Sequence, residues 1–176
     1  LLERFDKEFR MKFYRENVAT LADKEKLKFL KRWSDQEVQK VTLEHWRFKN
    51  FNDTKEFLKI MPLKLLEESE EFKNSLSEYI DKVIDQRINA DDLFKVAPLQ
   101  FLKKKLIRRI SPSQIHRYNS LISQVGETEK KRLLESLYKN ATKLSTKNFI
   151  NTLEVLSSRG FNISSAFITN HISNLK

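Results

Sequence analysis

The chain has 176 residues and a formal net charge of +10, with 3 Pro, 2 Gly and no Cys. The lack of Cys excludes disulfides, thiol catalysis and thiolate metal sites, and it favours an intracellular location. Because β-rich chains need turn residues between their strands, the scarcity of Gly and Pro excludes that class, and the abundant Leu, Lys, Glu and Arg predict an all-α fold.

The first 96 residues predict a neutral helical scaffold, because their 20 Lys and Arg are balanced by 20 Asp and Glu. The first helix is expected over residues 2–21, where Phe5, Phe9 and Phe13 recur one turn apart on a single face. A short helix follows, capped by Asp23 and ending near Trp33. The aromatic residues of this half are expected to form the core.

Capping patterns predict where the next helices begin. In SDQE (34–37) and in DTKE (53–56), the first side chain accepts a free backbone N–H and the Glu reaches back to the cap. Pro62 suits the first turn of a longer helix that reaches Ile88, because the missing N–H of Pro costs nothing there.

In the second half, Ala97-Pro98 and Ser111-Pro112 are typical helix starts. Gly126 and Gly160 are expected to end helices as left-handed caps. The last three helices are expected over about residues 128–139, 145–158 and 164–175.

Short polar turns between helices favour antiparallel hairpins. About ten short helices are expected, arranged either as the stacked hairpins of an α-solenoid-like fold or as an irregular bundle. We expect one all-α domain over residues 1–176, with a soft division between a neutral part, 1–96, and a basic part, 97–176. Because the chain opens at Leu1 rather than Met, it is expected to be a fragment of a longer chain or a processed product.

The whole excess of positive charge lies in residues 97–176, which contain 14 Lys and Arg against 4 Asp and Glu. In the stretch PLQFLKKKLIRRISPS (98–113), a helix places apolar residues on one side and cations on the other. Such a stripe can bind phosphate, although a plain solvated face is the alternative. The candidate nucleic-acid-binding residues of this and later helices are Lys103, Lys104, Lys105, Arg108, Arg109, Arg117, Lys130, Lys131 and Arg132.

The stretch GFNISSAFITNHISNL (160–175) contains no charged residue. As part of a helix-turn-helix, Gly160 would form the turn, and Thr169, Asn170 and His171 would face DNA without the Arg or Lys that usually reads guanine. Alternatively, the Phe and Ile residues of this stretch pack into the core, which explains its low charge. The last helix could also pack on a partner chain or on a further repeat that is missing here.

The stretch FINTLEVLSSRGFNIS (149–164) resembles a pentatricopeptide repeat. In that family, the second helix of a unit ends in an apolar residue, a short polar stretch and Gly, followed by an apolar residue and Pro. Leu156, Gly160 and Phe161 match those places, and Ile163 stands where the Pro usually is. RYNSLISQ is similar to the opening of a unit, but its spacing departs from the regular period of the family. The resemblance covers about 50 residues and implies single-stranded RNA binding on a concave helical surface, often in mitochondria or chloroplasts.

No catalytic or metal-binding pattern stands out in the sequence. The three His residues share no ligand spacing, and there is no Gly-rich phosphate loop or nucleophile elbow. The acidic run at residues 67–71 is expected to be a solvated helix start. No cofactor and no enzymatic activity are expected, and no apolar run is long enough for a transmembrane helix.

The sequence therefore predicts a non-catalytic helical scaffold that binds nucleic acid, with RNA as the leading ligand, through its basic half. The first alternative is a protein–protein interaction module whose basic face docks an acidic partner. The second alternative is a helix-turn-helix DNA binder. An intracellular location is expected, and mitochondria are one option that the resemblance implies.

Overall fold

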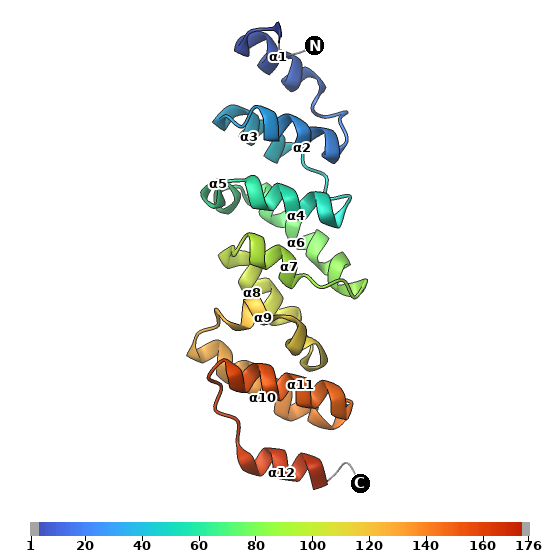
Figure 1. The fold of residues 1–176 in the computed structure, drawn as a ribbon, viewed down its shortest axis with the longest axis vertical. Helices are drawn as coiled ribbons and strands as arrows, with labels where there is room; N and C mark the ends of the chain where they lie inside the picture. Colours follow the sequence, from blue (N-terminus) through green and yellow to red (C-terminus); the bar gives the residue numbers. More distant parts are fainter. Residues whose placement is uncertain (1–3, 174–176) are drawn as a thin grey trace. The chain divides into compact units, whose positions relative to one another are not determined.

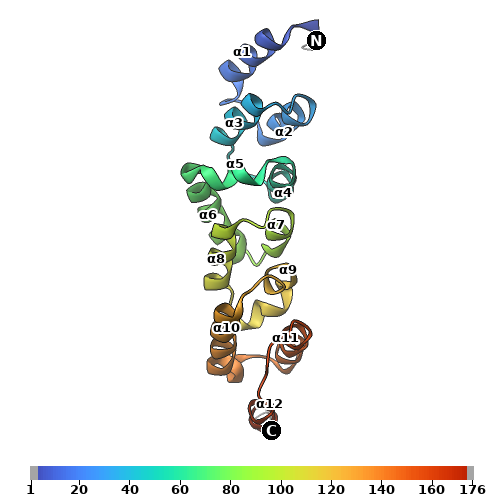
Figure 2. The same ribbon diagram turned by 90° about the vertical axis from the view of Figure 1, so that its left-hand side faces the viewer.

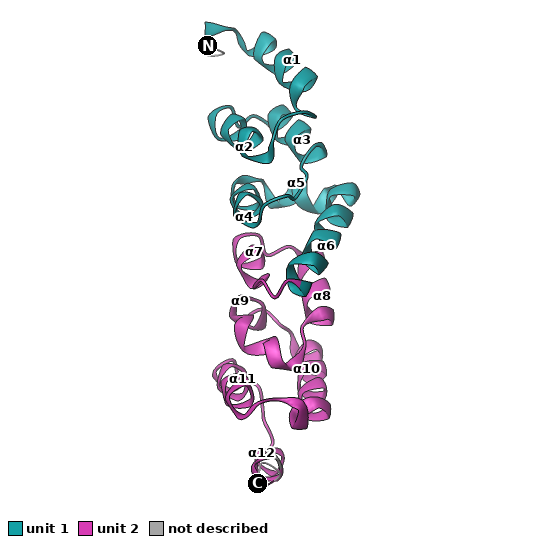
Figure 3. Cartoon of the chain, turned by 90° about the vertical axis from the view of Figure 1, so that its right-hand side faces the viewer, with its two compact units in different colours: residues 1–85 teal, residues 86–176 magenta. Residues whose placement is uncertain are grey.

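The computed structural model describes residues 4–173, the side chain of His171 excepted, and within them it contains helices and no strand. The predicted all-α fold is therefore confirmed. The chain divides into two compact units, residues 1–85 and 86–176, and each is described by itself (Figure 3). This division falls ahead of the soft division that the sequence places after residue 96. Unit 1 holds 18 Lys and Arg against 18 Asp and Glu, and unit 2 holds 16 against 6, so the entire charge of +10 belongs to unit 2.

Unit 1 is a succession of short helices (Figure 1). Several of its aromatic side chains are buried and pack against one another. Tyr14 stacks on Phe29 with ring centroids 3.9 Å apart, and Trp46 stacks on Phe57 at 4.0 Å. Phe57 also approaches Phe72, with centroids 6.0 Å apart. The helices of unit 1 are α1 (Lys7–Asn17), α2 (Asp23–Arg32), α3 (Gln36–Glu44), α4 (Phe51–Ile60), α5 (Leu63–Glu68) and α6 (Glu70–Asp85).

The three phenylalanines at the start of the chain are not part of this aromatic core. Phe5, Phe9 and Phe13 are 41%, 45% and 40% exposed, so the expectation that these rings form core is wrong. α1 packs through its opposite side, where Met11 and Tyr14 are buried.

A buried ion pair connects α2 to the loop that follows α3. The Nζ of Lys26, which is fully buried, donates to Asp23 Oδ1 at 3.2 Å and to the carbonyl oxygen of His45. Burial lowers the pKa of Lys26 below its usual value, while Asp23 acts in the opposite direction. The Asp23 carboxylate also accepts the backbone N–H groups of Arg47 at 3.2 Å and Lys49 at 3.3 Å. These two N–H groups flank Phe48, a non-glycine residue with a φ of 53°.

Unit 2 arranges its helices in two layers (Figure 2). One layer contains α7, α9 and α11, and the other contains α8 and α10, which follow one another along the unit. α12 follows α11 after an extended link. The bounds are α7 (Asp91–Val96), α8 (Gln100–Arg109), η2 (Pro112–Arg117), α9 (Asn119–Ile122), α10 (Glu127–Asn140), η3 (Ala141–Lys143), α11 (Thr146–Ser158) and α12 (Ser165–Ser173).

Asp91, at the start of α7, is 6% exposed and holds the start of α9. Its two carboxylate oxygens accept the backbone N–H groups of Ser120 and Leu121, both at 2.9 Å. Since the first N–H groups of a helix lack partners within it, Asp91 satisfies two of them while joining two helices of the same layer.

Several predicted helix starts are shifted along the chain. α3 is capped by Asp35, whose carboxylate accepts the N–H of Val38 at 2.9 Å, rather than by Ser34. α4 is capped by Asn50, three residues before the predicted Asp53. In both places more than one residue is a good cap, and the neighbouring turn decides which one is used.

Other boundaries also differ from the predicted ones. The first helix covers only α1, and Asp23 lies inside α2, whose N-cap is Ala22. The long helix expected after Pro62 is interrupted at Ser69, between α5 and α6, and it ends at Asp85, before Ile88. Ser69 Oγ accepts the N–H of Phe72 at 3.3 Å, which starts a new helix there.

The two glycines have different roles. Gly160 has a φ of 75° and ends α11 as predicted: the N–H of Phe161 donates to Leu156 and that of Gly160 to Ser157, the Schellman pattern. Gly126 has a φ of −83° and begins α10 instead, so the prediction of a left-handed cap there is wrong.

Candidate nucleic-acid interface

α8 buries one side and presents cations on the other. Leu102 and Leu106 are fully buried, whereas Lys104 and Arg108, one turn apart, are exposed. This agrees with the apolar and cationic sides predicted for the stretch 98–113. The two exposed cations lie on the side of α8 opposite the leucines, because residues four apart share a helix face.

A charged contact links α8 to the start of α10. Lys103 Nζ lies 3.3 Å from Glu129 Oε2, and the same oxygen accepts the N–H of Gly126 at 2.6 Å. The N–H of Gly126, together with Lys103 and Lys104, lowers the pKa of the Glu129 carboxyl. The ion pair of Lys103 with Glu129 therefore joins the two helices. Lys104 lies close enough to Glu129 to help lower the pKa of its carboxyl.

α10 presents further cations from its exposed side. Leu133 and Leu137 are buried, while Lys131, Arg132 and Lys139 are exposed. Lys139 was not among the predicted site residues, because an isolated Lys between polar residues gives no signal in the sequence. Glu135 is exposed on the same side and reduces the local positive charge.

We call Lys104, Arg108, Lys131, Arg132 and Lys139 the basic surface. All five belong to α8 and α10, the two helices of one layer of unit 2. The cations of separate helices, which the sequence alone could not place, thus come from one layer.

The other predicted site residues occupy different surroundings. Lys105 and Arg109 each have an interaction partner within the protein. Lys130 pairs with Glu127 at 2.8 Å and lies over the ring of Phe161, 5.6 Å from its centroid. Arg117 ends η2, where its carbonyl oxygen accepts a hydrogen bond from the Asn89 amide at 3.0 Å. Asn89 lies two residues before the first residue of α7, so Arg117 lies beside the other layer.

The last helix is less buried than predicted. Phe161 is buried, but Ile163, Phe167 and Ile168 are half-buried and Ile172 is 57% exposed, so the expected burial in the core is wrong for most of this stretch. Of the polar groups predicted to face DNA, the Thr169 hydroxyl donates within the helix to the carbonyl oxygen of Ser165 at 3.1 Å. The side chain of His171, and Leu175, lie outside the described part of the structure.

Among residues 4–173, no group of three or more His, Asp or Glu side chains is placed to hold a metal ion. His45 Nδ1 lies 3.0 Å from the carbonyl oxygen of Val41, and burial, with Arg117 nearby, lowers the pKa of His116. Within residues 4–173, no helix has the length and apolar character needed to cross a bilayer.

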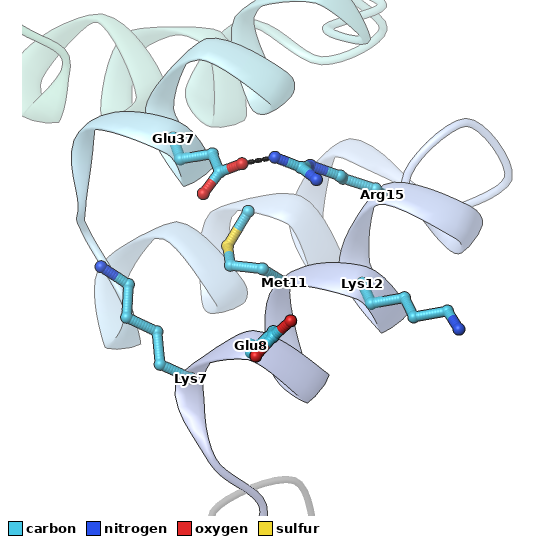
Figure 4. Close-up of a pocket in the computed structure, with 6 residues that line it drawn as sticks. All are labelled: Lys7, Glu8, Met11, Lys12, Arg15 and Glu37. Carbon is cyan, nitrogen blue, oxygen red and sulfur yellow. Dashed lines mark ion pairs between the residues drawn. The ribbon is translucent and has the colours of Figure 1, made fainter.

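A hollow of about 500 Å³ lies in unit 1 between α1 and α3 (Figure 4). Its wall is mostly charged, and these charges are partly neutralised by one another: Arg15 pairs with Glu37, and Lys7 lies 3.2 Å from Asp35. Met11 forms the apolar part of the wall.

Comparisons of the chain with family models, with curated proteins and with solved structures found no significant match.

Proposed function

We propose that the protein is a non-catalytic helical scaffold that binds single-stranded RNA through the basic surface of unit 2. The observation that carries this proposal is the placement of exposed cations on two helices of one layer, in the unit that holds the entire net charge. Arg can grip a phosphate with two hydrogen bonds, and Lys adds a point charge that tolerates many backbone geometries.

The chemistry of the basic surface favours affinity over sequence readout. Its side chains are cationic, and phosphate contacts position a nucleic acid without reading its bases. Binding should release counterions, so that log affinity falls with log salt by about 0.7 for each phosphate contacted on a single strand. If four or five phosphates are contacted, the slope is about −3.

The test is fluorescence anisotropy with labelled single-stranded RNA, single-stranded DNA and duplex DNA over a series of salt concentrations. Wild-type protein is expected to bind RNA with the steep slope given above. The variant Lys104→Glu/Arg108→Glu is expected to lose at least tenfold in affinity and to show a shallower slope, because two phosphate contacts become repulsive.

A matched control is Lys24→Glu/Lys28→Glu in α2. These two lysines are also exposed and one turn apart, and the control changes the net charge by the same amount. It should leave RNA binding nearly unchanged. An equal loss in both variants would mean that net charge alone drives binding and would contradict a localised site.

The same measurements separate the alternatives. Preference for duplex DNA, lost in Asn170→Ala, would support the helix-turn-helix interpretation instead. No binding to any nucleic acid would exclude the proposal and would favour the alternative, in which the basic surface docks an acidic protein.

A further inference from the structure

Ser111 carries an exposed hydroxyl in the short link between α8 and η2. The backbone is extended here, with φ and ψ of −65° and 123° at Ile110 and of −77° and 153° at Ser111. The Ser111 hydroxyl donates to Gln114 Oε1 at 3.1 Å and lies 2.9 Å from Ser113 Oγ. A group added to Ser111 would therefore replace contacts with near neighbours in the chain rather than contacts with distant segments.

The residues on both sides of Ser111 form a pattern that serine kinases can recognise. Arg108 and Arg109, both exposed, stand three and two places before Ser111, and Pro112 follows it. An arginine- and proline-directed kinase holds such arginines with carboxylates, through charged hydrogen bonds, and accepts a Pro directly after the target. Pro112 also favours the extended backbone that a kinase cleft requires at Ser111, because the residue before a Pro is kept out of the helical region.

The end of α8 has to open when a kinase acts. Arg109 is the last residue of α8 and Ile110 is buried, so the folded chain presents Ser111 in extended form but not the two arginines. Terminal turns of helices open at a small part of the free energy of global unfolding. The kinase therefore needs the last turn of α8 to unwind, while the rest of unit 2 stays folded.

We propose that Ser111 is a phosphorylation site for an arginine- and proline-directed serine kinase, and that its phosphate pairs with Arg108 and weakens RNA binding by the basic surface. The effect on RNA rests on the function proposed above. In the reaction, Ser111 Oγ attacks the γ-phosphorus of ATP, the bond from that phosphorus to the oxygen that bridges it to the β-phosphorus breaks, and ADP leaves. The hydroxyl proton passes to a carboxylate of the kinase.

Charge explains why a phosphate on Ser111 acts on the basic surface. Arg108 belongs to that surface and lies three residues from Ser111, within the range of its long side chain. A phosphate adds roughly two negative charges at pH 7 and can pair with an Arg through two hydrogen bonds. It lies just past the C-terminal end of α8, where the helix dipole disfavours an anion, so an arginine partner offsets this cost. An Arg108 side chain that binds the phosphate is no longer available to RNA.

The first measurement locates the phosphate. Whole protein is incubated with ATP and a purified kinase of this class, and mass spectrometry identifies the modified residue. Ser111 is expected to carry the phosphate in the wild type and in Ser113→Ala, whereas Ser111→Ala should lose most of the incorporation. Phosphate found mainly on another residue would overturn the assignment.

The second measurement tests the pair with Arg108. Whole protein with phosphoserine in place of Ser111, made by amber suppression, is titrated by phosphorus NMR without RNA. The second pKa of the phosphate is expected to be lower than in the same protein carrying Arg108→Gln, because the guanidinium favours the doubly charged form. Equal pKa values in the two proteins would exclude the pair.

The third measurement is fluorescence anisotropy with single-stranded RNA. Phosphoserine in place of Ser111 is expected to weaken binding about tenfold and to make the salt slope shallower by about 0.7, because one phosphate contact is lost. The matched control carries phosphoserine in place of Ser157, which is exposed on α11, in the other layer of unit 2. An equal loss in both proteins would show a general effect of charge and would overturn the regulatory role.

These outcomes separate the inference from the proposed function. If the unmodified protein binds no RNA, the proposed function and the regulatory role fail together. The first two measurements use no RNA, so they still decide whether Ser111 is the site and Arg108 its partner.

Discussion

Two buried aspartates hold the beginning of one helix against the backbone of a later segment. Asp23 does this in unit 1 for the N–H groups of Arg47 and Lys49, and Asp91 does it in unit 2 for those of Ser120 and Leu121. Hydrogen bonds to a buried charge are about twice as strong as neutral ones. Both residues therefore stabilise tertiary structure. From the sequence alone, an Asp at a helix start is predicted only to cap its own helix.

For Asp91→Ala, we expect a loss of about 2 kcal/mol in the free energy of unfolding, because two N–H groups lose a charged acceptor. Asp92→Ala is the matched control: Asp92 is exposed, and its removal should change stability by less than about 0.5 kcal/mol. Urea denaturation followed by circular dichroism measures both. Equal effects of the two substitutions would show that Asp91 acts only through the charge at the start of α7.

Tyr14 makes stability depend on pH in the alkaline range. Its hydroxyl lies 2.8 Å from Thr42 Oγ1, and burial raises the pKa of Tyr14 to about 12. Since an unfolded tyrosine titrates near pH 10, the stabilising effect is complete below about pH 10 and is lost as pH rises towards 12.

Tyr14→Phe should cost about 1 kcal/mol at neutral pH and should make the decline between about pH 10 and 12 shallower. Part of the decline should remain, because burial also raises the pKa of Tyr79 and Tyr118. Urea midpoints at several pH values test this. An unchanged slope in the variant would assign the whole decline to other groups.

At the scale of single helices, the sequence predicts that a helix exists better than it predicts the residues at which the helix begins and ends. The spacing of Leu102, Leu106 and Ile107 is enough to predict α8, and the ends of α2 and α11 agree with the predicted ones. The starts of α3 and α4 do not, because several neighbouring side chains compete to accept the first N–H groups. A local pattern cannot decide between them when the next turn is fixed by tertiary contacts.

Gly160 provides a prediction about a helix end. Its φ of 75° is costly for any residue with a Cβ, although no atom within 4 Å would obstruct one. Gly160→Ala should therefore lower stability by about 1 kcal/mol, from backbone strain alone. Gly126→Ser, at a φ of −83° on the N-cap of α10, should be neutral or stabilising. Thermal unfolding of both variants gives the comparison, and a neutral Gly160→Ala would contradict the strain argument.

At the scale of the whole molecule, the sequence predicts an uneven charge but not its placement. A count of residues is enough to show that the excess of positive charge lies in the second half. The packing of the helices decides the rest: Lys103 joins α8 to α10, while Lys104 and Arg108 point away from the core. Burial of the last helix was predicted wrongly for a related reason: apolar residues such as Ile172 indicate a face that needs a neighbour, and the sequence does not say where that neighbour is.

The aspartate contacts also bear on how fast the chain folds. Asp23 and Asp91 reach backbone groups only 24 to 30 residues further along the chain. Closing loops of that length costs less entropy than closing longer ones, and folding rates rise when the partners of native contacts are close in sequence. Each contact can form once its own stretch of chain is available, before the rest has been synthesised. The protein is thus suited to folding progressively from its N-terminus during translation, with each aspartate fixing one step.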